Sequence, residues 1–137
     1  MITSRKLSDL HPKVHLMAET FLEECRRQSI DVLIYCTYRD AEAQNKLYDI
    51  GRRLPGKTVT DAKGGQSMHN YRLAFDWVPL IHGKPAWNDK VLYLICGEVA
   101  ESIGLEWAGR WKRRKETAHC QWTGGLSLED LQAGKMP

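Results

Sequence analysis

The sequence predicts an α+β domain in which helices pack on a small, mainly antiparallel sheet. Two segments have apolar residues at the spacing of helices, a third has the cap residues of a helix, and short runs of β-forming residues lie between them. The 137 residues suffice for one compact domain but not for two, and no internal repeat or linker divides them. We therefore expect residues 1–137 to form a single domain.

The first helix is expected to begin near Ser8 or Asp9, with Pro12 in its first turn. Proline suits this position because it lacks the N–H that the first helical turn leaves unpaired. The apolar stripe that would face the core consists of Val14, Met17, Phe21, Leu22 and Cys25.

Residues 30–36 predict a buried strand, because this short segment is apolar and rich in β-forming side chains. A second helix is expected from about Asp40 to Ile50, with Asp40 as its N-cap and Gly51 just past its end. Residues 52–68 contain Pro-Gly and Gly-Gly pairs and therefore predict a loop.

A strand is expected over residues 72–80, followed by a hairpin turn at residues 82–84. The third helix should begin at Asn88 or Asp89, and Gly104 should end it. Its predicted buried stripe consists of Val91, Leu92, Ile95, Val99 and Ile103.

Two further strands are expected at residues 105–107 and 118–122. Residues 127–130 have the pattern of a capping box, which would open a short last helix. Four tryptophans are expected in the core rather than at a substrate-binding surface, although one of them could line the groove: Trp77, Trp87, Trp107 and Trp122.

Two imidazoles and two carboxylates are the most informative side chains. His69 precedes Asp76 by seven residues, and Glu116 precedes His119 by three. Catalytic zinc commonly takes three protein ligands and leaves a fourth position for water. The two imidazoles and one of the carboxylates would supply the three ligands, and the second carboxylate could activate the water. Either spacing alone arises easily by chance, so the hypothesis depends on their occurring together.

The spacing restricts the backbone that could form such a site. In one helix, His69 and Asp76 would lie roughly 10.5 Å apart along the axis, too far for bonds of ~2 Å to one ion. In one straight strand they would face opposite sides of a sheet. The site therefore requires His69 on a loop, with a bend before the strand that carries Asp76. By the same argument, Glu116 should lie at the entrance of a strand and His119 inside it.

These segments resemble the zinc peptidases that include D-alanyl-D-alanine carboxypeptidases and phage-endolysin L-alanyl-D-glutamate peptidases. The similarity covers residues 8–135 and implies a hedgehog/D-Ala-D-Ala peptidase-like fold. It is carried by Ser67-x-His69-x6-Asp76, by Glu116-x-x-His119, and by Thr37-Tyr38-Arg39-Asp40 with Gln44, Leu47, Tyr48, Gly51 and Arg52 after it.

The resemblance implies a role for each matching residue. His69, Asp76 and His119 would bind Zn²⁺. Glu116 would act first as the general base and then as the proton donor to the leaving amine. Arg39 would stabilise negative charge on the substrate carbonyl, a role that suits a fixed guanidinium in a dry site.

Three further residues are candidates for substrate binding. Gln66 and Ser67 could orient the substrate or a metal ligand, although Ser67 could equally be a loop hydroxyl. Members of the family often have glycine where this chain has Arg72. An arginine there could narrow the pocket or reach carboxylates of the substrate.

The four cysteines are widely spaced and include no Cys-x-x-Cys pair. Cys25, Cys36 and Cys96 lie in apolar stretches and are expected to be buried free thiols. Cys120 follows His119 in an expected strand, so it should face away from the metal and into the core. If Cys120 did bind the metal, the site would be closed and structural.

The resemblance implies a peptidoglycan stem peptide as the substrate, cut at the L-Ala–D-Glu bond or, alternatively, at the D-Ala–D-Ala bond. No apolar run approaches the ~18 residues that span a membrane, and no secretory signal is visible. We therefore expect a monomeric phage or prophage endolysin. It would accumulate in the host cytoplasm until a holin-type partner releases it to the cell wall.

Two other classes of protein compete with this interpretation. Residues 110–115 form a basic run with one aromatic residue, which could attract an anionic wall, membrane surface or muropeptide, or be a solvated loop. A nucleic-acid binder would use this run, but the net charge is only +3 and the candidate ligands would go unexplained. A zinc-binding interaction module would need neither Glu116 nor Arg39. We expect no nucleic-acid partner and no stable membrane insertion.

Overall fold

The computed structural model describes residues 1–137 and confirms the predicted α+β class. The α-helices are α1 (Pro12–Arg27), α2 (Ala41–Asp49), α3 (Lys90–Ser102) and α4 (Leu128–Gln132). The strands are β1 (Asp31–Cys36), β2 (Ala74–Ile81), β3 (Lys84–Pro85), β4 (Glu106–Trp107) and β5 (His119–Gln121). Short 3-10 helices are η1 (Leu7–Asp9), η2 (Met68–Tyr71) and η3 (Ala108–Arg110). None of the helices has the length and apolar character needed to cross a membrane.

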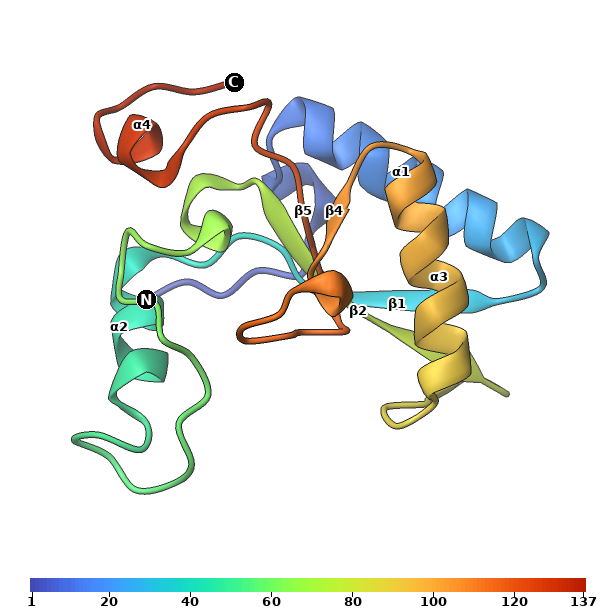
Figure 1. Cartoon of the computed structure of the whole chain (residues 1–137), viewed down its shortest axis with the longest axis horizontal. Coiled ribbons are helices and arrows are strands. Elements are labelled where there is room, and N and C mark those ends of the chain that lie inside the picture. The colour runs from blue at the N-terminus through green and yellow to red at the C-terminus, as the bar shows by residue number, and fades with distance from the viewer.

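The strands form one antiparallel sheet in the order β1-β2-β5-β4, with β3 paired to the end of β2. α1 contacts β1, α3 contacts β2 and β4, and the two helices contact each other. Figure 1 shows α2 on the other side of the molecule, beside the N-terminus. The two long helices therefore cover the core face of the sheet, and α2 with its following loop is free to border a site.

The core lies between β2 and the two covering helices. Phe21 of α1 packs against Phe75 and Trp77 of β2, with ring centroids 5.7 and 5.1 Å apart. Tyr93 of α3 packs against Trp77 with its centroid at 5.1 Å. All four rings are buried, and aromatic pairs at such distances stabilise a core beyond the area that they bury.

Successive side chains of β2 point alternately to the core and to the opposite face of the sheet. Phe75 and Trp77 belong to the hydrophobic core, whereas Asp76 between them points to the other side of the sheet. The strand register places Asp76 opposite His119 of β5 and opposite Cys36 of β1. A row of three side chains that can bind a metal or a proton therefore crosses the sheet on the face away from α1 and α3.

A β-bulge in β1 brings Cys36 to this face. Ile34 pairs with Trp77 and belongs to the core, whereas Cys36 pairs with Asp76, so Tyr35 is the extra residue. In a regular strand Ile34 and Cys36 would share one face, because side chains two residues apart point the same way. The bulge therefore separates an aliphatic core residue from a thiol at the candidate site.

The predicted caps and turns agree with the structure. The Asp40 carboxylate accepts a hydrogen bond from Ala43 N–H at the start of α2, and Ser127 forms a capping box with Asp130 at α4. Residues 82–83 join β2 to β3 with positive φ at both positions, which is typical of a two-residue hairpin turn.

The first helix begins later than predicted. Residues 7–9 form η1, and α1 starts at Pro12, whose fixed φ and missing N–H favour the first helical position. His11 is the N-cap, and its Nδ1 accepts a hydrogen bond from Lys13 N–H at 3.1 Å. The polar residues Ser8 and Asp9 therefore precede the helix instead of opening it.

Two predictions about burial are wrong. Val91 is 66% exposed, and Trp87 is 53% exposed and packs edge-on against Tyr35 with ring centroids 5.3 Å apart. Apolar residues lie on several sides of α3, so periodicity alone did not select its buried face. That face consists of Tyr93, Cys96, Gly97, Val99 and Ala100.

Phe21→Ala should lower the free energy of unfolding by about 3–5 kcal/mol, because it removes a fully buried ring from the core. Val91→Ala should change it by less than about 0.5 kcal/mol, because that side chain is exposed on α3. Urea unfolding followed by tryptophan fluorescence measures both. Similar losses for the two variants would contradict this assignment of the core.

Candidate metal centre and active-site cleft

His69 lies on a bend, as its seven-residue separation from Asp76 requires. It belongs to η2, where the Ser67 hydroxyl accepts a hydrogen bond from His69 N–H at 3.2 Å. Arg72 then adopts a left-handed conformation with φ of 65°, which ends η2 and directs the chain into β2. The imidazole of His69 consequently faces Asp76, seven residues further along.

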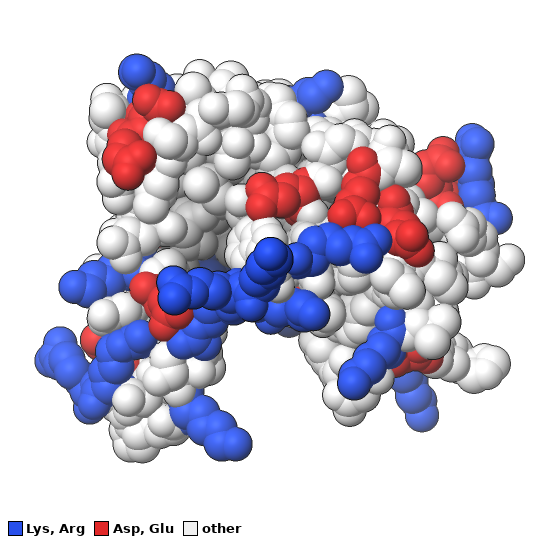
Figure 2. Space-filling model, viewed as in Figure 1, with Lys and Arg blue, Asp and Glu red and all other residues white.

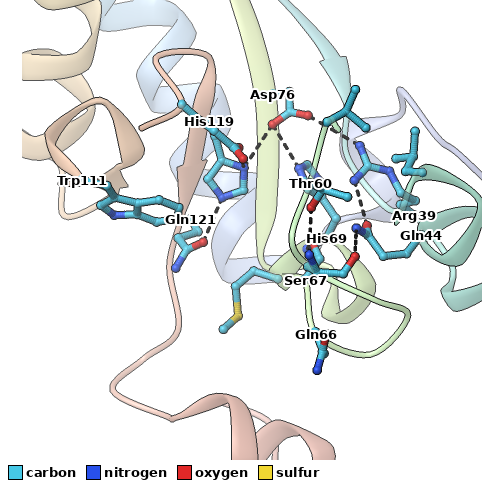
Figure 3. Close-up of a pocket in the computed structure, with 15 residues that line it drawn as sticks. Arg39, Gln44, Thr60, Gln66, Ser67, His69, Asp76, Trp111, His119 and Gln121 are labelled. Carbon is cyan, nitrogen blue, oxygen red and sulfur yellow. Dashed lines mark hydrogen bonds and ion pairs between the residues drawn. The ribbon is translucent and has the colours of Figure 1, made fainter. Parts of the chain in front are cut away.

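Asp76 is the centre of the candidate site. Its Oδ1 lies 3.0 Å from Nε2 of His69 and 3.1 Å from Nδ1 of His119. Figure 3 shows both rings directed at this carboxylate. Donor atoms around a tetrahedral ion lie roughly 3.3 Å apart when the bonds are ~2 Å long. The three side chains therefore form a set that can hold a divalent metal ion.

Each imidazole is oriented by a second partner. Nδ1–H of His69 donates to the carbonyl of buried Thr37 at 2.7 Å, which leaves Nε2 toward Asp76. Nε2–H of His119 donates to Oε1 of Gln121 at 2.9 Å, which leaves Nδ1 toward Asp76. Metal-binding histidines typically have their outer nitrogen fixed in this way. The contacts that hold the two rings, as well as the donor atoms themselves, thus suit a bound metal ion.

The same side chains form a coupled acid–base group. Burial favours the neutral imidazole of His69, but the carboxylate of Asp76 outweighs burial and raises the pKa of His69 to about 10. Burial also disfavours the ionised form of Asp76, but the charges and hydrogen bonds of His69 and His119 hold its pKa well below the usual range. A metal cation bound here would replace the proton that His69 carries.

Cys36 offers a second grouping of donors. Its sulfur forms a cluster with His69 and Asp76 in which the donor atoms all lie within 4.8 Å of one another. The sulfur is 3.9 Å from Nδ1 of His69, the nitrogen that faces away from Asp76, and accepts a hydrogen bond from Nη2 of Arg39 at 3.3 Å. Cys36 therefore lies behind the His69 ring, and His119 is a better third donor than Cys36 beside His69 and Asp76.

Glu116 and Arg39 flank the donor set. Glu116 precedes β5, whose first residue is His119, and its Oε2 lies 3.7 Å from Nδ1 of that histidine. On the other side, Nη2 of Arg39 lies 3.7 Å from Oδ2 of Asp76, and its Nη1 donates to Gln44 at 3.0 Å (Figure 3). A carboxylate that can take a proton and a fixed guanidinium thus border the same centre.

These groups open into a cleft of about 460 Å³. The loop after α2 supplies one wall through Thr60 and Ala62, and Trp111 and Gln121 lie on the other. The Trp111 ring is 5.6 Å from the His119 ring between centroids, and its Nε1–H donates to Glu106 at 2.7 Å. Figure 3 places Trp111 and Arg39 on opposite sides of Asp76, so a bound chain would pass between them.

Two of the three candidates for substrate binding line the cleft, and the third lies outside it. Gln66 and Ser67 line the cleft, although both also accept local backbone hydrogen bonds. Arg72 lies outside it, with its guanidinium 3.9 Å from the centre of the Tyr38 ring and hydrogen-bonded to the carbonyl of Asp9 at 2.8 Å. The expectation that Arg72 narrows the pocket is therefore wrong, because the left-handed turn sends its side chain elsewhere.

Among the residues at the site, Cys36 and Gln121 were not predicted there, and Trp111 was noted only as the aromatic residue of the basic run at residues 110–115. Cys36 is a buried free thiol as predicted, but its place beside Asp76 did not follow from the sequence because the bulge has no signal there. Gln121 follows His119 by two residues in a strand, so alternation could have placed it on the same face. Trp111 lies in an irregular loop, where periodicity carries no information. Cys120, by contrast, lies in the core as predicted.

Comparison with known proteins agrees with this geometry. The sequence profile of a family described as D-alanyl-D-alanine carboxypeptidase matches residues 60–122, which include the candidate ligands. The chain is 37% identical over 123 residues to the peptidoglycan L-alanyl-D-glutamate endopeptidase CwlK of Bacillus subtilis, and the match covers 83% of this chain and 74% of that protein. The chain belongs to the D-alanyl-D-alanine carboxypeptidase (M15) family of peptidases.

Solved peptidase structures share the fold of this M15 peptidase. The L-Ala D-Glu endopeptidase ChiX of Serratia marcescens has a TM-score of 0.67 at 20% identity, covering 95% of this chain and 92% of that one. The vancomycin-resistance D,D-pentapeptidase VanY, solved with Zn(II), has a TM-score of 0.64 at 16% identity, covering 90% of this chain and 83% of that one. The predicted peptidase fold is therefore confirmed.

The M15 site should bind Zn²⁺ more tightly as the pH rises. The pKa of His69 is about 10, so the ring carries a proton at neutral pH that must leave when it binds a metal. Below that pKa the apparent affinity should rise about tenfold per pH unit, with release of about one proton per ion. Titration calorimetry in buffers of different ionisation enthalpy measures the proton count.

The matched control is His15→Ala, which removes a partly exposed histidine that is paired with Glu19 on α1. The proton count of this variant should equal that of the wild type. An affinity that does not change between about pH 6 and pH 9 would contradict the assignment of His69 as a ligand.

Proposed function

We propose that this M15 peptidase is a zinc-dependent peptidoglycan hydrolase that cuts the L-Ala–D-Glu bond of the stem peptide. The observation that carries the proposal is the convergence of His69, Asp76 and His119 on one point beside the carboxylate of Glu116. The 37% identity to CwlK, which is named an L-alanyl-D-glutamate endopeptidase, supports the choice of bond.

The ligands of the zinc ion would be Nε2 of His69, Oδ1 of Asp76 and Nδ1 of His119. Imidazole nitrogens and a carboxylate oxygen are donors that zinc accepts, and three of them leave a position open. Bound zinc supplies Lewis-acid polarisation of the scissile carbonyl and of the attacking water. The protein contributes the fixed orientation of the donors through the contacts of the two rings with Thr37 and Gln121.

Glu116 would move the proton during hydrolysis. Its side chain is 43% exposed and lines the cleft beside His119, so both water and a substrate can reach it. We assign it to take a proton from the attacking water and to deliver that proton to the departing amine of D-Glu. Trp111 lines the same part of the cleft and would shield this transfer from bulk water.

Arg39 would oppose the negative charge that develops on the scissile carbonyl oxygen. Gln44 and Cys36 accept hydrogen bonds from its guanidinium at 3.0 and 3.3 Å, and its Nε is buried without a partner. A guanidinium that is already held in place stabilises developing charge without reorganising during the reaction. The need to hold the guanidinium in place explains why Gln44 is fully buried beside Arg39 at the edge of the cleft.

A D-Ala–D-Ala carboxypeptidase is the alternative function within the same family. The description of the matching family profile favours it, as does the likeness of fold to VanYB in complex with D-alanine-D-alanine, at a TM-score of 0.64. The same residues would serve both bonds, so only the product distinguishes them. A zinc-binding module without catalysis is disfavoured because Glu116 and Arg39 both border the cleft.

Glu116→Gln should lower kcat for peptidoglycan hydrolysis by about 10²–10⁴-fold while zinc stays bound, because it removes the base and no metal donor. Glu129→Gln is the control, since it removes an exposed carboxylate on α4 and should keep wild-type activity. Mass spectrometry of purified peptidoglycan, digested by the zinc-loaded protein with a chelated control, identifies the products.

Each product has a defined meaning. Stem peptides with a free D-Glu amino group would support the L-Ala–D-Glu bond, and release of D-alanine alone would assign the D-Ala–D-Ala bond instead. Full activity of Glu116→Gln would refute its role as the base. The absence of any zinc-dependent product from several wall types would refute the hydrolase itself.

We also propose that the enzyme is a monomeric phage or prophage endolysin that reaches the wall from the host cytoplasm with a holin-type partner. The small size of the single domain supports this proposal. Bacteria that express the protein in the cytoplasm should grow normally until their membrane is permeabilised, and the culture should then clear. Cells that express Glu116→Gln should not clear. Lysis before permeabilisation would argue against a release partner.

A further inference from the structure

Two loops meet at the mouth of the cleft through one ion pair. Arg114, in the loop before β5, contacts Asp61, in the loop after α2, at 2.6 Å from Nε to Oδ2 and 2.6 Å from Nη2 to Oδ1. The two residues are 53 positions apart in the sequence. The guanidinium of Arg114 is therefore already arranged to receive a carboxylate at two points.

The pair lies where the cleft continues outward. A second hollow of about 330 Å³ shares Thr60, Ala62, Gln66, Trp111 and Glu116 with the walls of the active-site cleft. Its remaining lining residues are Asp61, Arg114 and Leu128. A substrate that extends from the reacting bond into this hollow would consequently contact the ion pair.

Local structure aims Arg114 at this position. Its backbone has φ of 50°, in the left-handed region that residues with a side chain rarely adopt. Both partners of the pair are partly exposed, Arg114 at 43% and Asp61 at 61% of their side-chain surface. Exposed ion pairs exchange readily because water solvates both partners when they separate. An incoming carboxylate could therefore replace Asp61.

The surrounding charge favours an anion. Lys112, Arg113 and Lys115 are exposed and form no salt bridge. Figure 2 shows Lys and Arg side chains gathered in a band across the middle of this face, where Figure 1 places the loop before β5. The positive charge of this band would raise the local concentration of anionic peptides.

We propose that Arg114 binds a carboxylate of the stem peptide, and that Asp61 occupies its guanidinium until the substrate displaces it. This inference rests on the proposed function, because stem peptides carry a free α-carboxylate on D-Glu, beside the bond that is cut. Arg114 would then be a specificity residue that favours stem peptides with this carboxylate free over those with it amidated. Asp61 would be an internal competitor for the same site.

The test compares L-alanyl-γ-D-glutamyl-L-lysine peptides with the glutamate α-carboxylate free or amidated, each extended at its N-terminus by a lactoyl group. For each enzyme variant, the measured quantity is the ratio of kcat/KM for the free form to that for the amidated form. Arg114→Gln should lower this ratio about tenfold, mainly through KM for the free form. Asp61→Asn should raise it about threefold, because the competing charge is lost.

Arg5→Gln is the matched control, since it removes an exposed arginine that makes no ion pair and lies outside the cleft, the outer hollow and the basic band. Its ratio should stay within about twofold of the wild type. Arg114→Lys, which keeps the charge without the two-point geometry, should give a ratio between those of Arg114→Gln and the wild type.

Opposite effects of Arg114→Gln and Asp61→Asn would support the proposal. Equal losses on the two peptides, or shifts of the ratio in the same direction, would overturn it and assign the pair to loop structure. If the wild type cuts neither peptide, the proposed function has failed separately. Calorimetry on the wild type and Arg114→Gln then decides the inference by comparing the affinity for the free peptide with the affinity for the amidated peptide. If Arg114 binds the carboxylate, the preference for the free peptide falls in Arg114→Gln. An unchanged preference overturns the proposal.

Discussion

The antiparallel pairing of β2 with β1 and β5 is the constraint on which both the core and the site depend. One side of β2 carries Phe75 and Trp77 into the aromatic core under α1 and α3. The other side carries Asp76 into register with His119 and Cys36. A slip of one residue would exchange the two faces and place a carboxylate in the core. The burial of two aromatic rings therefore fixes the position of the carboxylate at the candidate metal centre.

The site combines residues of paired strands with residues of irregular loops. Asp76 and His119 come from adjacent strands, and His69 is anchored through Thr37, so backbone pairing sets the donor positions before any metal binds. The groups that would meet the substrate, such as Trp111 and Glu116, come from a loop. Loops tolerate changes of sequence and length better than a paired strand does. Substrate preference can consequently change in this family while the donors stay in place.

Most of the fold followed from the sequence because it rests on regular periodicity. The candidate site followed from the spacing of its donor residues and from the resemblance to a family. The spacing of His69 and Asp76 excluded a helix or a straight strand and required the bend that η2 and Arg72 provide. Alternation also placed Cys120 in the core. The position of Cys36 did not follow, because a bulge depends on the partner strand. The ion pair of Asp61 with Arg114 did not follow either, because it joins two irregular loops far apart in the chain.

The bulge at Tyr35 has a consequence for how this chain can vary in length. The bulge offsets β1 by one position just before the segment that carries Arg39. The pairing of Cys36 with Asp76 and the position of Arg39 therefore both depend on the one extra residue in this part of β1. Deleting one residue there would restore the regular alternation and rotate the following side chains away from the cleft. Residues 53–57 of the loop after α2 are exposed and line neither the cleft nor the outer hollow, so they have no such count to keep, and a longer loop there costs little in closure entropy. Chain length is thus a functional property in one segment of this protein and a free variable in another.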